Sequence, residues 1–134
     1  MDLQNLSYAL VQLAHNFGAA AIVGIAWFGW QHVPQAPARL AGWLALAWAV
    51  QIVSGATFGA TSLYYYGQLP DIHGIAIVAL AIKVVAALLG LVLALIYIGR
   101  TRAVVGQAPT RAWLLQTVLG IIALSAAAFL RWFS

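Results

Sequence analysis

The sequence contains no cysteine, and its only methionine is the first residue. Disulfides, thiolate metal sites, iron–sulfur clusters and thioether ligands are therefore excluded from its chemistry. Charge is scarce as well, because Asp, Glu, Lys and Arg together make up 6% of the residues and only two of these are acidic. Among the side chains that bind the softer metal ions, only the imidazole of histidine is therefore available in this chain.

Apolar residues are abundant, at 65% of the chain, and the mean hydropathy is +0.98. A soluble domain of this size would not tolerate such a surface, so the sequence predicts an integral membrane protein in contact with the lipid bilayer. The net charge of +4 is explained by membrane topology, and no nucleic-acid partner is expected.

Four apolar runs of about bilayer length are separated by short polar connections. We expect spans at residues 6–30, 40–63, 72–98 and 112–133, within a single domain of residues 1–134. The connections contain all four prolines, Pro34, Pro37, Pro70 and Pro109. Because short connections make neighbouring helices antiparallel, the predicted fold is an all-α membrane protein, an antiparallel up-down four-helix bundle.

Basic residues indicate the orientation of this bundle. The first and third connections hold Arg39, Arg100, Arg102 and Arg111, whereas the opposite side carries Asp2, Asp71 and Arg131. By the positive-inside rule, the arginine connections are cytoplasmic and both termini lie outside.

Lys83 is the one charge in the apolar run of residues 74–99, where it costs roughly 2.5–3.5 kcal/mol on insertion scales. Its helical face is mostly small, with Ala76, Ala79, Leu80, Ala86, Ala87 and Gly90. Because small residues let neighbouring helices approach closely, we expect Lys83 to point into the bundle and not at lipid.

Each expected span contributes a polar side chain to nearly one level, twelve to fifteen positions from its cytoplasmic end; these are His15, Gln51, Lys83 and Ser125. His15 and the Gln51 carbonyl are expected to accept hydrogen bonds from Lys83. Two interpretations stay open: the layer fixes the register of the bundle, or it binds an ion, proton or cofactor.

Other residues suggest sites near the outer mouth. His73 and Asp71 follow Pro70 and form either a small cation site or a solvated interfacial pair. Tyr64, Tyr65 and Tyr66 form an aromatic belt or, less simply, contact a ligand. Gly55 and Gly59 form a GxxxG pair, which serves packing within the bundle or a homodimer.

A further pattern extends over most of the chain, with His15 before small residues to Gly18, then Tyr66, Gly67, Lys83, Arg100 and Pro109. In these residues the chain resembles the membrane domain of the CopD copper-resistance family. The resemblance implies a bacterial inner-membrane protein that handles periplasmic copper, with a periplasmic metal-binding protein as a partner. His15, His73 and Asp71 would then be the metal residues.

Two alternatives come from other functional classes. One is a b-type cytochrome that exchanges electrons with quinone, with histidines as axial ligands of haem b. His15 and His73 differ in depth by about ten residues, roughly 15 Å, which disfavours ligation of one haem by both. The other is an accessory subunit without chemistry of its own. The sequence supports no assignment of catalytic residues.

Overall fold

The computed structural model describes residues 2–32, 38–103 and 110–133. It contains four helices, α1 (Leu3–Gln31), α2 (Ala38–Tyr66), α3 (Ile75–Ala103) and α4 (Thr110–Phe133). All four are long and apolar enough to cross a membrane. The all-helical prediction with four spans is thus confirmed, and the helices indicate a multi-pass membrane protein. Three of the predicted connection residues, Pro34, Pro37 and Pro109, lie outside the described residues.

The helix ends differ from the predicted spans for local reasons. Asp2 caps α1 by accepting a hydrogen bond from the Gln4 amide at 3.1 Å, so the helix begins before the apolar run. α2 continues through the tyrosines and ends where Gly67 takes a φ of 69° and donates to Leu63 O at 3.0 Å. α3 begins after Gly74, whose φ of 51° interrupts the helical backbone.

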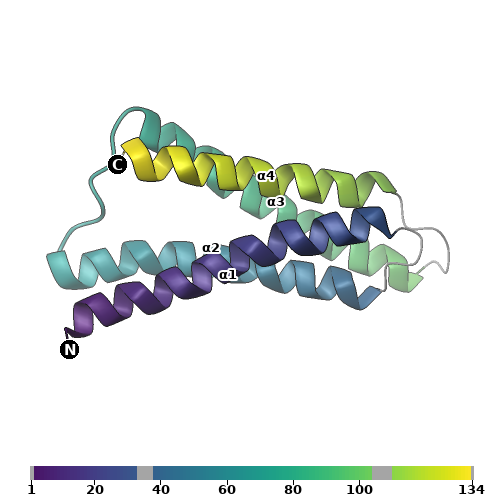
Figure 1. Cartoon of the computed structure of the whole chain (residues 1–134), viewed down its shortest axis with the longest axis horizontal. Coiled ribbons are helices and arrows are strands. Elements are labelled where there is room, and N and C mark those ends of the chain that lie inside the picture. Colours follow the sequence, from purple (N-terminus) through teal and green to yellow (C-terminus); the bar gives the residue numbers. More distant parts are fainter. Residues whose placement is uncertain (1, 33–37, 104–109, 134) are drawn as a thin grey trace.

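Each helix packs against two others: α1 and α3 both contact α2 and α4. Sequence neighbours run antiparallel, and both termini lie at one end of the bundle with the loop of residues 67–74 (Figure 1). We call this the terminal end, and the opposite end, which holds Arg39, Arg100 and Arg111, the arginine end. The α1/α2 pair and the α3/α4 pair diverge toward the terminal end (Figure 1).

The apolar core lies mainly in the half nearer the arginine end. Trp48 from α2 and Trp113 from α4 are its largest fully buried side chains. A Cβ atom at Gly90 would overlap the Trp48 ring, and one at Gly29 would overlap Trp113. These two glycines therefore let α3 and α1 approach bulky indoles that fill the space between the helices.

Candidate functional site: a polar cluster inside the bundle

Lys83 lies at the centre of the buried stripe of α3. Its neighbours on that stripe, one turn away on each side, are Ala79 and Ala86, which are 4% and 3% exposed. The Nζ atom of Lys83 is 2.8 Å from Nε2 of His15 on α1. Because α1 and α3 are not packed against each other, the long lysine side chain spans the bundle to make this contact.

The ring of His15 is held at its other nitrogen by α2. Nδ1 is 2.7 Å from Ser54 Oγ, and Ser54 Oγ lies 2.6 Å from the Val50 carbonyl oxygen. A hydroxyl has one hydrogen, which Ser54 donates to Val50, so its oxygen accepts from His15 Nδ1–H. This pattern assigns the neutral tautomer with an unprotonated Nε2, whose lone pair faces Lys83.

Gln51 brings a second donor to the same nitrogen, because its Nε2 is 2.8 Å from His15 Nε2. Its Oε1 is buried and has no hydrogen-bond partner among the described residues. One lone pair cannot satisfy two donors, so the cluster retains an unpaired acceptor oxygen together with surplus N–H groups. The predicted hydrogen bond from Lys83 to the Gln51 carbonyl is therefore not formed, and this buried oxygen is an uncommon unpaired acceptor.

Small residues make room for these contacts. A Cβ at Gly18 would lie 3.0 Å from Gln51 Oε1, a tight contact, so glycine at this position favours the close approach of α1 to the amide. A Cβ at Gly55 would lie 3.6 Å from His15 Cε1, and one at Gly59 would lie 3.7 Å from Leu69. Both glycines of the GxxxG pair therefore have neighbours within the chain, and the homodimer stays a prediction.

The structure does not bring Ser125 to this cluster. Its side chain is exposed, because α4 turns Gln116, Ala123 and Ala126 inward instead. Counting depth along a helix gave the level of Ser125 but not its rotation about the helix axis. The same depth argument holds for His15, Gln51 and Lys83, which do meet.

Gln116 is the buried polar residue of α4, and sequence reasoning missed it. Its Oε1 accepts from Trp48 Nε1 at 2.8 Å, and its Nε2 donates to the Gly90 carbonyl at 2.8 Å. The signal in the sequence was its spacing of four and seven residues from Gly120 and Ala123, a small-residue face. Both ends of this amide are paired, so it binds helices together and offers no free group.

The predicted outer-mouth residues lie at the terminal end of the bundle. They are separated from His15, which lies in the middle of α1. His73 Nε2 is 3.2 Å from Asp71 Oδ1, and both side chains are exposed. Tyr65 OH lies 3.2 Å from Ser7 Oγ, Tyr66 OH accepts from Gln4, and Tyr64 is exposed. Within the described residues, no group of three or more His, Cys, Asp or Glu is placed to hold a metal ion.

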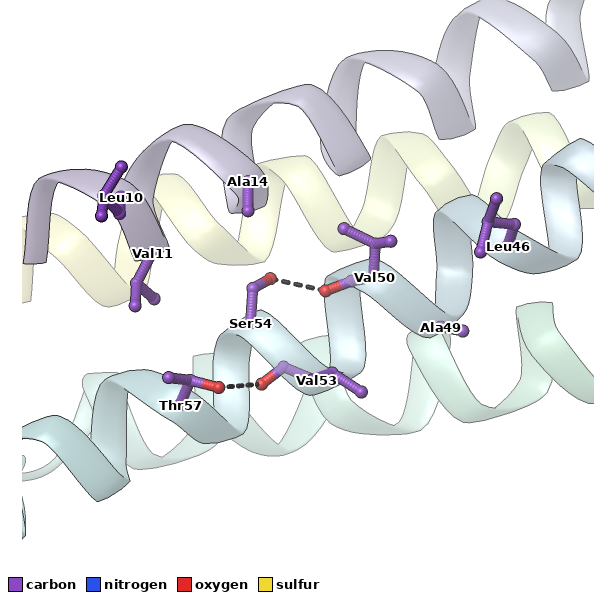
Figure 2. A pocket seen from close by; sticks show the side chains of 9 residues that line it. All are labelled: Leu10, Val11, Ala14, Leu46, Ala49, Val50, Val53, Ser54 and Thr57. Carbon is purple, nitrogen blue, oxygen red and sulfur yellow. Dashed lines mark hydrogen bonds between the residues drawn. The ribbon is translucent and has the colours of Figure 1, made fainter. Parts of the chain in front are cut away.

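An apolar groove of about 490 Å³ runs beside the cluster on the outer surface of α1 and α2. Figure 2 shows its lining, in which Ser54 and Thr57 turn their hydroxyls to the carbonyls of Val50 and Val53 on their own helix. The groove therefore presents carbon to its surroundings, as a surface in contact with lipid tails does. The groove shares Ser54 with the polar cluster but exposes no polar atom of it.

Comparison with known proteins finds no family model, curated protein or solved structure that matches the chain. The functional argument consequently rests on the geometry of the chain's own side chains.

Proposed function

We propose that this chain is a CopD-like protein of the bacterial inner membrane that binds a copper ion at His15, Gln51 and Lys83 in exchange for a proton. The observation that carries the proposal is the 2.8 Å contact between Lys83 Nζ and His15 Nε2, two nitrogen bases facing each other inside an apolar bundle. Ionisable groups at this depth are costly and usually serve ion, proton or cofactor sites.

The charge balance supports an exchange. The sequence has two acidic side chains, Asp2 and Asp71, and both lie at the terminal end. The positive charge of Lys83 is therefore compensated inside the bundle by hydrogen-bond acceptors alone. A bound metal cation adds positive charge to the site. Release of the Lys83 proton to water removes one positive charge and so offsets part of this increase.

The donor set fits a metal that accepts imidazole. His15 Nε2 is unprotonated, so a metal ion could take the lone pair that now faces Lys83 and Gln51, and its Nδ1–H is held by Ser54, the arrangement that orients histidine ligands in metal sites. The unpaired Gln51 Oε1 and the neutral amine of Lys83 are the other available ligands. We propose copper because of the family resemblance, and imidazole is a ligand that copper accepts.

The proposed orientation places the terminal end in the periplasm, because the opposite end holds Arg39, Arg100 and Arg111. The exposed pair of His73 and Asp71 then faces the compartment from which copper, or a periplasmic metal-binding partner, would arrive. We propose that this pair makes the first, weak contact with the ion.

The test is a copper(II) titration of purified protein in weakly buffered detergent, with pH and binding recorded together. We expect release of about one proton per bound ion, loss of binding in His15→Gln, and loss of the proton signal in Lys83→Met. His32→Ala is the matched control, because His32 is an exposed histidine outside the cluster. Copper binding that persists in His15→Gln would contradict the proposal.

The same preparation tests the alternative of a b-type cytochrome, because bound haem gives a Soret band in the absorption spectrum. Such a band that disappears in His15→Gln would replace the copper proposal with haem ligation by His15.

A further inference from the structure

The burial pattern along α1 divides this helix into two halves. The buried residues of α1 are His15, Gly18, Ile22, Ala26 and Gly29. The twelve residues at the terminal end of this helix, residues 3–14, include no buried residue. On α4 the last buried residue is Ala126, and residues 127–133 are half-buried or exposed. α1 and α4 are therefore packed together near the arginine end and open near the terminal end.

The close contacts between these two helices agree with this division. A Cβ at Gly120 of α4 would lie 3.0 Å from Ile22 and 3.2 Å from Val23 of α1. The other tight approach, Gly29 against Trp113, lies still nearer the arginine end. Toward the terminal end, α1 and α4 separate, as Figure 1 shows.

The side of α1 that faces this separation is polar. Residues spaced by four, seven and eleven lie on one helical face, so the face of Val23 continues through Asn16 to Gln12. Gln12 Nε2 donates to Asn16 Oδ1 at 2.6 Å, and both side chains are exposed. Two exposed amides in the middle of a span are unfavourable against hydrocarbon, whereas water satisfies their remaining groups.

Lys83 supplies an independent observation. It occupies the centre of the inward stripe of α3, yet it is only half-buried while Ala79 and Ala86 beside it are buried. A residue that faces inward and is still accessible borders space inside the bundle. The Lys83 ammonium contacts His15, and therefore lies at the level where the buried part of α1 begins.

The part of the bundle nearer the arginine end is closely packed beyond Lys83. Trp48, Gln116 and Gly90 form a hydrogen-bonded layer across α2, α4 and α3. Gly90 lies two turns from Lys83 toward the arginine end, about 10 Å along the helix axis. Trp48 is fully buried in this layer, and its indole lies directly against Gly90 of α3.

We propose that the helix pairs α1/α2 and α3/α4 enclose a water-filled vestibule that opens at the terminal end and ends at Lys83 and His15. The cluster then exchanges protons and small hydrophilic ions with that side of the membrane alone, and the Trp48–Gln116–Gly90 layer seals it from the arginine end. This inference concerns access and does not depend on which ion binds.

The absence of cysteine from the natural sequence makes a direct test possible. Single variants Gln12→Cys, Asn16→Cys and Lys83→Cys are reconstituted in vesicles and treated with a membrane-impermeant methanethiosulfonate from each side. Gln68→Cys reports the terminal end and Gln31→Cys the arginine end, since both residues are exposed there. Leu13→Cys, exposed on the side of α1 that points away from its buried residues, is the control facing lipid.

We expect Asn16→Cys and Lys83→Cys to react from the side that labels Gln68→Cys, and only from that side. Their rates should exceed that of Leu13→Cys by at least about tenfold, because a thiol must meet water to form the reactive thiolate. Thr117→Cys, a near-isosteric change in the sealed half, should stay unreactive.

Two results would overturn the vestibule. One is labelling of Asn16→Cys no faster than Leu13→Cys, which would mean that lipid or another helix covers the amide face. The other is labelling of Lys83→Cys or Thr117→Cys from the arginine end. Either result leaves the copper titration unaffected, so the two proposals fail separately. Asn16→Cys replaces an exposed residue, so its folding is not at issue.

Discussion

At the scale of single residues, the site depends on how His15 is held. Ser54 orients one ring nitrogen, and the other faces both Lys83 and Gln51. Phe58 packs edge-on against the same ring at a centroid distance of 5.6 Å. The imidazole is thus positioned by α2 and presents its lone pair to α3, an arrangement suited to a proton or a metal ion.

Lys83→Met should leave the bundle at least as stable as the wild type. The change keeps much of the side-chain length and removes a half-buried charge, whose desolvation opposes its favourable contacts. Thermal unfolding in detergent measures the stability, and copper-dependent growth measures function. A variant that unfolds without a separable functional loss would favour a structural role for the lysine.

Ser54→Ala should destabilise the protein by about 0.5–2 kcal/mol, because the buried His15 Nδ1–H loses its acceptor. Metal affinity should fall about 10- to 100-fold, as it does when the group that orients a histidine ligand is removed. Thr57→Ala is the control, since the Thr57 hydroxyl bonds to the carbonyl of Val53 on its own helix. Equal effects of the two changes would show that Ser54 does not orient His15.

At the scale of elements, α3 combines two tasks on one face. Near its middle the face carries Lys83, and two turns further it carries Gly90, against which Trp48 packs. The glycine lets Trp48 reach the space in which Gln116 accepts its indole N–H. Packing of α3 therefore seals the cluster on the side toward the arginine end.

Gly90→Ala should destabilise the protein by about 1–3 kcal/mol, because the added methyl group overlaps the Trp48 ring and the core must shift. Gly42→Ala on α2 and Gly99→Ala on α3 itself are matched controls, since a Cβ there meets nothing within 4 Å. These controls should be neutral or slightly stabilising through helix propensity. Thermal unfolding of the three variants in one detergent compares them, and a Gly90→Ala protein as stable as the controls would contradict the packing argument.

At the scale of the whole molecule, the bundle has two unlike ends. The arginine end is closely packed and basic, and the terminal end carries both acidic residues and the divergent helix pairs. The direction from which the cluster is reached therefore depends on membrane orientation, which the arginines predict.

In cells, a thiol at Gln68→Cys should react with an impermeant reagent added to the periplasm, and one at Gln31→Cys should not. Both positions are exposed at opposite ends of the bundle. Arg39, Arg100 and Arg111 favour retention of the arginine end in the cytoplasm. The reverse labelling pattern would invert the proposed topology and turn the vestibule toward the cytoplasm.

The sequence by itself determined the helices and the face that α3 turns inward. Runs of bilayer length must satisfy their backbone groups within each helix, and a stripe of small residues around Lys83 identifies the buried face of α3. Tertiary structure decided the rest, because rotation of α4 and divergence of the helix pairs depend on packing between helices. Packing turned Ser125 outward, brought Ser54 to His15 and placed Gln116 against Trp48. No single helix carries these relations, since each joins residues far apart in the chain through contacts that form only when the bundle closes.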